Sequence, residues 1–151
     1  AGCRDGELDV RGISHRGYFA SITDFKSYHD ANMDLIDYKT ATDLFHDNWP
    51  IYTRTNNSCP THYFDTANVS NSVISNGSMI EGTVENSIVG RGCTIKKGAV
   101  IKNCVVLADC TIGENVHIEN LVVDKHAKIT HAKEIIRPAD EPGYIKRNDT
   151  L

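Results

Sequence analysis

The chain has 151 residues, with 16 lysine and arginine residues against 20 aspartate and glutamate residues. This length suits one ordinary domain, or a small domain joined to an elongated one. The formal net charge of −4 gives no reason to expect nucleic acid or an anionic membrane as the main partner. No apolar run approaches the roughly 20 residues that span a bilayer.

Five cysteines occur, an odd number, and none belongs to a C-x-x-C pair. A secreted protein held together by disulfides normally carries an even set of cysteines. The sequence therefore predicts a cytoplasmic protein whose thiols are reduced.

The composition changes near residue 65. Ten of the eleven aromatic residues lie between Tyr18 and Phe64, and none lies between Asp65 and Gly143. A region without large rings cannot build a conventional aromatic core. Valine and isoleucine dominate there instead, and both residues favour strands.

A helix is predicted near the start of the aromatic part. Before it, residues 7–19 alternate weakly between apolar and polar, which predicts a pair of strands. Ser21 or Thr23 is a candidate N-cap, with Asp24 in the first turn. Phe25 begins a series spaced by 3, 4 and 3 positions, which predicts a helix over residues 23–36.

The next part of the chain is predicted to be mostly extended. Residues 43–45 are a candidate for a short helical turn. Residues 46–64 are interpreted as an extended linker, because Pro50 and Pro60 disfavour helix at the residues before them.

A repeat of 17 residues begins at Val89, and an earlier repeat is shorter by two residues. Within each repeat the aliphatic residues recur every five or six positions, which is neither the helical nor the strand period. This pattern predicts a solenoid with three short strands per coil and one aliphatic column on each inner wall. The columns are Val89, Val106 and Val123; Ile95, Ile112 and Ile129; and Ile101, Ile118 and Ile135, with Ile74, Ile80 and Val84 in the earlier coil.

Residues that tolerate a left-handed backbone stand at the predicted corners. Asn86, Asn103 and Asn120 fall one coil apart, and stacked asparagine side chains can hydrogen-bond along a ladder. The next coil lacks such residues, so regular coiling is expected to fade over residues 123–136. An ordinary β-sandwich is the alternative, but it needs alternating strands and long turn clusters.

A second aliphatic stripe is predicted on the outside of the solenoid. Ile88, Val105 and Val122 align at the 17-residue offset, and the core does not need them. A neighbouring domain or subunit is therefore expected against this face. The linker aromatics Trp49, Tyr52, Tyr63 and Phe64 are expected to cap the first coil.

Four features occur in a fixed order: Gly17-Tyr18-Phe19, Ala31-Asn32-Met33-Asp34-Leu35, Trp49-Pro50-Ile51-Tyr52-Thr53 and the hexapeptide-type repeat. This order resembles bacterial glucose-1-phosphate adenylyltransferase, or ADP-glucose pyrophosphorylase, over about residues 17–129. The resemblance implies a mainly β fold, a left-handed parallel β-helix preceded by a helix and an extended linker. It also implies that the parent enzyme uses Mg²⁺ and ATP to convert glucose 1-phosphate to ADP-glucose and pyrophosphate in glycogen biosynthesis.

Two departures from the family pattern favour its regulatory, non-catalytic subunit. The glycine-rich phosphate-binding signature, G-G-x-G-T-R-L, has no counterpart in this chain, so no catalytic, cofactor or metal residue is assigned to it. Ser21 stands where catalytic members carry a metal-binding aspartate. Serine is a poor Mg²⁺ ligand beside phosphates, where carboxylates normally hold the ion.

A few basic residues are candidate contacts for an effector. The resemblance implies regulation by sugar phosphates or other anions, bound where the solenoid meets the catalytic domain. The candidates are Arg54, Arg91, Lys96 and Lys97. A solvated basic face is the alternative interpretation. Cys59 and His62 have metal-ligand spacing, but two ligands do not make a tetrahedral site.

The sequence predicts four segments. Residues 1–20 are expected to be the end of a catalytic domain, 21–64 a helix and linker, 65–136 the left-handed β-helix, and 137–151 a C-terminal tail. The expected role is assembly with adenylyltransferase subunits, as a homo- or hetero-oligomer, together with allosteric coupling. A trimeric hexapeptide acyltransferase, with His117 or His126 as general base, and a free-standing scaffold are the alternatives.

Overall fold

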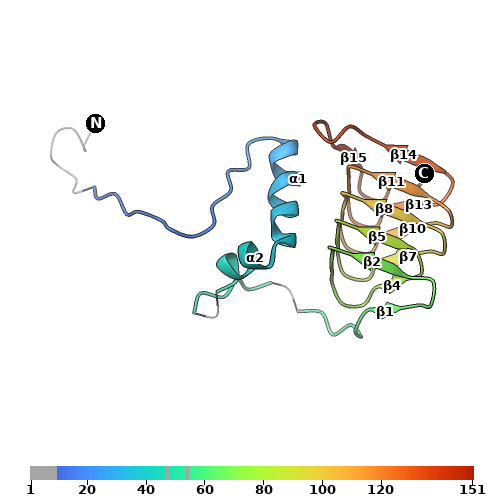
Figure 1. Ribbon diagram of the computed structural model, residues 1–151, viewed down its shortest axis with the longest axis horizontal. Coiled ribbons are helices and arrows are strands. Elements are labelled where there is room, and N and C mark those ends of the chain that lie inside the picture. The colour runs from blue at the N-terminus through green and yellow to red at the C-terminus, as the bar shows by residue number, and fades with distance from the viewer. Residues whose placement is uncertain (1–9, 47, 54) are drawn as a thin grey trace.

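A computed structural model describes residues 10–46, 48–53 and 55–151. They form a parallel β-solenoid preceded by a short helical segment. In Figure 1 the helix α1 stands beside the solenoid, roughly along its long axis, and residues 10–20 extend away from both.

The helical segment begins at a capping box. Helix α1 (Phe25–Met33) follows Asp24, whose carboxylate accepts a hydrogen bond from the Ser27 N–H at 2.7 Å. The Ser27 hydroxyl in turn accepts from the Asp24 N–H at 3.0 Å. The prediction of Ser21 or Thr23 as the N-cap is therefore wrong, because the reciprocal pair of bonds places the cap at Asp24.

Two further helical turns follow α1. A 3₁₀ turn, η1 (Asp34–Ile36), continues it, so the predicted helical span ends where expected. Helix α2 (Tyr38–Leu44) then begins at the N-cap Asp37, whose carboxylate accepts from the Thr40 N–H at 2.9 Å. The predicted turn at residues 43–45 is thus the end of a longer helix.

The first described residues differ from the prediction. Residues 10–19 contain no strand, so the predicted strand pair is wrong over that range, and residues 7–9 lie outside the described part. A lone pair of strands is marginal without further sheet to pack on. The linker prediction is confirmed over residues 46, 48–53 and 55–61, which contain neither helix nor strand. It is wrong at residues 62–63, which form the first strand of the solenoid and pair with the next coil.

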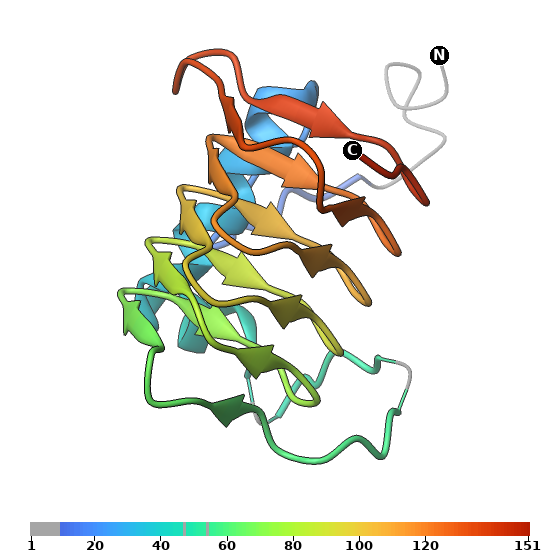
Figure 2. The same cartoon turned by 90° about the vertical axis from the view of Figure 1, so that its right-hand side faces the viewer.

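The described residues form fifteen short strands in three parallel sheets, one for each side of a triangular prism (Figure 2). The first sheet contains β1 (His62–Tyr63), β4 (Met79–Ile80), β7 (Thr94–Ile95), β10 (Thr111–Ile112) and β13 (Lys128–Ile129). The second contains β2 (Asn68–Ser70), β5 (Thr83–Glu85), β8 (Val100–Lys102), β11 (His117–Glu119) and β14 (Glu134–Ile136). The third contains β3 (Val73–Ile74), β6 (Ile88–Val89), β9 (Val105–Val106), β12 (Leu121–Val123) and β15 (Gly143–Ile145).

The strand register confirms the predicted aliphatic columns. Ile95 pairs with Ile112, and Ile112 pairs with Ile129, and all three are fully buried. The shortened early coil is also confirmed, and its missing residues fall at Gly82. A Cβ at Gly82 would lie 2.5 Å from the Ala99 carbonyl oxygen, so this tight corner has room only for glycine.

The asparagine ladder forms as expected. Asn86, Asn103 and Asn120 have positive φ angles, and the Asn86 amide donates to Asn103 Oδ1. Asn120 instead donates to the Arg137 carbonyl oxygen, which continues the corner without an asparagine side chain.

Coiling does not fade after residue 123, so that expectation is wrong. His126 adopts the corner conformation with φ of 62°, and β15 pairs in register with β12. Thr150 forms a parallel bridge with Lys128, so the segment expected to be a tail belongs to the ladder. Pairing continues because it uses backbone groups, and histidine is among the residues that adopt the left-handed conformation.

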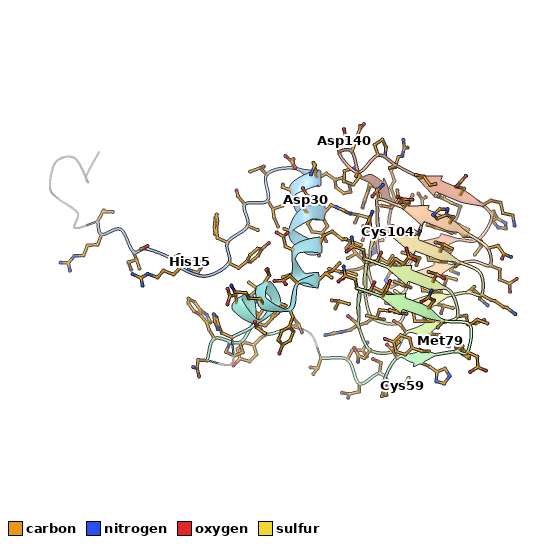
Figure 3. All side chains as sticks on the ribbon, in the orientation of Figure 1. His15, Asp30, Cys59, Met79, Cys104 and Asp140 are labelled. Atoms are coloured by element: carbon orange, nitrogen blue, oxygen red, sulfur yellow. The ribbon has the colours of Figure 1, made fainter. Side chains whose placement is uncertain are left out.

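The chain's own helix α1 packs against part of the outer aliphatic stripe, at β9, while Ile88 on an earlier coil is half-buried. Val105 and Val122 are both 1% exposed. His29 of α1 is buried, and its Nε2 lies 2.9 Å from the Asn103 carbonyl oxygen. Figure 3 labels Asp30 on α1 and Cys104 on the adjoining coils. A neighbouring domain or subunit was expected on this face, and helix α1 of the same chain packs there.

Trp49 and Tyr52 do not cap the first coil, whereas Tyr63 lies in its strand β1 and Phe64 directly follows that strand. Trp49 is 82% exposed and Tyr52 is 92% exposed. Their predicted contact is therefore wrong. The turn at residues 48–49 and the extended path after it leave both rings in solvent.

Candidate functional site

One corner of the solenoid carries a column of basic residues. The corner residues with positive φ are Gly77, Gly92, Asp109, His126 and Asn148. The residues just before them are Asn76, Arg91, Ala108, Lys125 and Arg147. Backbone bonds stack these pairs along the column, since Asp109 N–H donates to Arg91 O at 2.8 Å and Asn148 N–H to Lys125 O at 3.1 Å.

A hollow lies in this column because Ala108 has no long side chain. Arg91 and Lys125 stand on the coils to either side of Ala108, about 10 Å apart at two inter-strand spacings. The hollow measures about 520 Å³ and is open to solvent. Its other lining residues are Thr55, Asn56, Asp109, His126 and Arg147. We call this feature the corner hollow.

The corner hollow is electropositive. Among the described lining residues, Arg91, Lys125 and Arg147 contribute three cations, against one carboxylate, that of Asp109. His126 Nδ1 lies 3.7 Å from Asp109 Oδ2, so part of that negative charge is directed at the imidazole. A lining of this kind suits a small anion such as a phosphate.

A second carboxylate lies just behind this lining. Asp124 accepts hydrogen bonds from the Tyr144 hydroxyl and the Lys125 N–H, both at 2.7 Å. These two bonds lower the pKa of Asp124, and the charges of Arg147 and Lys125 lower it further. Asp124 is therefore ionised at neutral pH.

The structure places Lys96 and Lys97 away from this corner. Lys97 lines a separate hollow with Glu114 and Asn115, and Lys96 lines one beside it with Lys133. Both belong to a different corner of the prism. Arg54 lies outside the described residues. Of the three candidates that the structure describes, only Arg91 lines the corner hollow.

Sequence reasoning missed Lys125 and Arg147. The 17-residue offset already aligns Lys125 with Ala108 and Arg91, so Lys125 was accessible to the repeat analysis. Arg147 could not be identified from the repeat, because the last coil is longer than 17 residues: Val123 pairs with Ile145, 22 positions later. The extra residues form the loop over residues 137–142, which breaks the period.

The histidines considered for acyl transfer stand apart from each other. His117 of β11 lies between two carboxylates, 3.8 Å from Glu119 Oε2 and 3.6 Å from Glu134 Oε1, on the outer face of the second sheet. His126 lines the corner hollow. The two rings therefore belong to different surfaces of the solenoid.

The thiols of the described residues are free, as predicted. These are Cys59, Cys93, Cys104 and Cys110. Burial raises the pKa of Cys104 to about 12. A hydrogen bond with Cys110, together with burial, raises the pKa of Cys93. Cys93 and Cys104 are therefore protonated core residues at neutral pH and poor nucleophiles.

The described residues do not fit the Mg²⁺ and ATP of the adenylyltransferase resemblance. Ser21 is exposed, and the Asp24 carboxylate is occupied as a helix cap. Within the described ranges, no group of three or more His, Cys, Asp or Glu side chains is arranged to hold a metal ion. In the same ranges, no helix has the length and apolar character needed to cross a membrane.

The model of the GlmU-like, C-terminal hexapeptide family matches residues 60–141, more than half of the chain. The chain belongs to this family. The assignment agrees with the coils, since the matched range contains β1 to β14.

Curated relatives confirm the resemblance to adenylyltransferases. The glycogen biosynthesis protein GlgD of Bacillus subtilis is 36% identical over 140 residues, which cover 93% of this chain and 41% of that protein. Glucose-1-phosphate adenylyltransferase of Geobacillus stearothermophilus is 42% identical over 86 residues, 57% of this chain and 22% of the enzyme. The Bacillus mycoides adenylyltransferase is 36% identical, with 81% and 32% covered. The chain thus spans less than half the length of these relatives.

Proposed function

We propose that this chain is the C-terminal assembly and effector-binding segment of a glucose-1-phosphate adenylyltransferase-type protein of glycogen biosynthesis. Its role is regulatory, and the synthesis of ADP-glucose takes place in the part that its relatives carry outside the matched region. The similarity to GlgD and to adenylyltransferases over the solenoid supports this assignment. The reduced thiols are consistent with a place in the cytoplasm.

The corner hollow is the observation that carries the effector role. Three permanent cations from three coils and one lining carboxylate favour a phosphate-bearing ligand. A sugar phosphate fits the proposed function, because the substrates and products of the adenylyltransferase reaction carry phosphate groups. Arg91 is the sequence candidate retained in this site, and Lys125 and Arg147 join it.

The outer side of the helical segment is the proposed docking surface for an adenylyltransferase domain or subunit. Phe19 is 79% exposed and Ile22 is 58% exposed. Both residues, with Tyr18, Leu35 and Leu44, line a mostly apolar hollow of about 370 Å³. A large partner domain would bury these side chains. The relatives contain such additional sequence, since this chain covers at most 41% of the three compared.

A regulatory rather than catalytic parent is favoured by residues 19–24. Ser21 replaces the carboxylate expected by resemblance to catalytic members, and serine holds Mg²⁺ poorly beside phosphates. Mg²⁺ and ATP are accordingly assigned to the catalytic partner and not to this segment.

Binding of a small anion to matched variants tests the effector site. We expect the intact chain to bind glucose 1-phosphate or inorganic phosphate by calorimetry at low ionic strength, with affinity falling as salt rises. Lys125→Ala and Arg147→Ala should each weaken binding several-fold. Lys96→Ala and Lys97→Ala are the matched controls and should bind normally. Absence of binding to the unmodified chain, or equal losses in the controls, would contradict the site.

A further inference from the structure

Helix α1 and the corner hollow are connected through one residue, Tyr144. Its ring meets Phe25 of α1 edge to face, with ring centres 5.7 Å apart. Its hydroxyl donates to Asp124 Oδ2 at 2.7 Å. Asp124 directly precedes Lys125, and Tyr144 lies three residues before Arg147. Two cations of the corner hollow therefore flank the Tyr144–Asp124 contact.

The Asp124 carboxylate can compete with a bound anion for Lys125 and Arg147. Lys125 and Arg147 both act electrostatically on its carboxylate. One carboxylate oxygen is occupied by the Lys125 N–H and the other by the Tyr144 hydroxyl. Without the hydroxyl, the second oxygen is available to a charged donor, and carboxylates bind ammonium and guanidinium groups more strongly than neutral donors. Such pairing would reduce the positive charge offered to an anion.

The position of Tyr144 depends on α1 because β15 is the last strand of its sheet. Among the described strands, β15 pairs with β12 alone. Terminal strands of a repeat array have a neighbour on one side only, so they open most easily. Phe25 provides the contact on the outer face of this strand.

We propose that Tyr144 couples the docking of α1 to anion binding in the corner hollow. With α1 docked, Phe25 holds the Tyr144 ring, the hydroxyl holds Asp124, and Lys125 and Arg147 are left for the anion. With α1 released, Asp124 turns to these cations and the hollow loses affinity. The coupling rests on the anion site proposed above. Because linkage is reciprocal, a bound anion must in turn favour the docked helix.

A double-mutant cycle with inorganic phosphate as the probe tests this coupling. We expect Tyr144→Phe to weaken phosphate binding about two- to fivefold, the range of an exposed ion pair. Asp124→Asn should strengthen binding, and adding Tyr144→Phe to Asp124→Asn should have no further effect. Tyr38→Phe, a hydroxyl removed from an exposed ring (82%), is the matched control. An equal loss from Tyr144→Phe in both backgrounds would overturn the role of Asp124.

Hydrogen exchange tests the link to α1 independently. Phosphate should slow amide exchange across residues 25–33 in the unmodified chain, and this slowing should disappear in Tyr144→Phe. Retention of the full slowing in Tyr144→Phe would overturn the coupling while leaving the anion site intact. Failure of the unmodified chain to bind phosphate at all would instead overturn the site, and the coupling with it. Thermal melts of each variant distinguish a loss of coupling from a loss of fold.

Discussion

At two inner corners of the solenoid, small polar side chains accept hydrogen bonds from backbone N–H groups of the next coil. Ser78 and Ser87 are buried, and their hydroxyls accept hydrogen bonds from the Cys93 N–H at 3.1 Å and the Cys104 N–H at 3.0 Å. In later coils the same positions hold cysteine, alanine or leucine. Beside these polar corners, the isoleucine columns form a continuous apolar wall. Individual inward side chains should therefore have large effects on stability.

Replacement of one isoleucine column residue should unfold the neighbouring coils. Ile112 is fully buried between Ile95 and Ile129. In Ile112→Asp the carboxylate would have no partner, at a cost of several kcal/mol. We expect a large fall in the thermal midpoint measured by circular dichroism. Thr111→Asp, one position away on the outer face, is the control and should melt close to the unmodified chain. An unchanged melt in Ile112→Asp would refute the inward assignment.

The cap of α1 should depend on pH. The hydrogen bond from the Ser27 N–H lowers the pKa of Asp24 below its usual 3.8. A lowered pKa adds stability that is present above pH 3.8 and is lost as the pH falls through the lowered value. The first turn of α1 should thus fray in this acid range, detected by amide NMR of residues 25–28. Asparagine caps about as well without titrating, so Asp24→Asn should fray less on acidification. Identical acid profiles for both chains would contradict the prediction.

At the scale of elements, α1 packs on the outer aliphatic stripe, where a neighbouring domain or subunit was expected. The helix meets the solenoid at His29 and Phe25, and it packs against β9, which contains the buried Val105. Isolated nine-residue helices are marginal in water, so most of the stability of α1 must come from this packing. The solenoid does not have the same dependence on α1, because its strands pair with one another.

Loss of the His29 contact should release α1 while leaving the coils folded. His29→Ala removes the bond to the Asn103 carbonyl and opens a gap in the interface. We expect faster amide exchange over residues 25–33 and little change over β7 and β10. His15→Ala, the same replacement at an exposed position, is the control. Equal acceleration in the coils would indicate that α1 and the solenoid unfold as one unit.

At the scale of the whole molecule, the described chain offers surfaces for assembly and an electropositive hollow. Large exposed apolar side chains occur before the helical segment, within it and in the linker that follows it. Such a surface requires a partner in solution. A dimer or tetramer by light scattering would agree with an adenylyltransferase-type assembly, whereas a trimer would favour the acyltransferase alternative.

The purified chain should make no ADP-glucose from ATP and glucose 1-phosphate. It lacks the glycine-rich phosphate-binding signature, and Ser21 and Asp24 do not provide a site for Mg²⁺. A coupled pyrophosphate-release assay with Mg²⁺ present measures this directly. A full-length catalytic adenylyltransferase is the positive control. Turnover above the no-protein baseline would place an active site within these 151 residues.

The periodic part of the fold was predictable from the sequence, and the contacts between distant segments were not. Ile95, Ile112 and Ile129 line one wall because a regular repeat returns each position to the same place on the prism. Lys125 follows from the same rule. The docking of Phe25 on Tyr144 and the arrival of Arg147 beside Lys125 have no periodic signal, because they join segments separated by a linker or by an irregular loop. Repetition therefore determined the solenoid, while tertiary packing alone decided where α1 binds and which cations share a hollow.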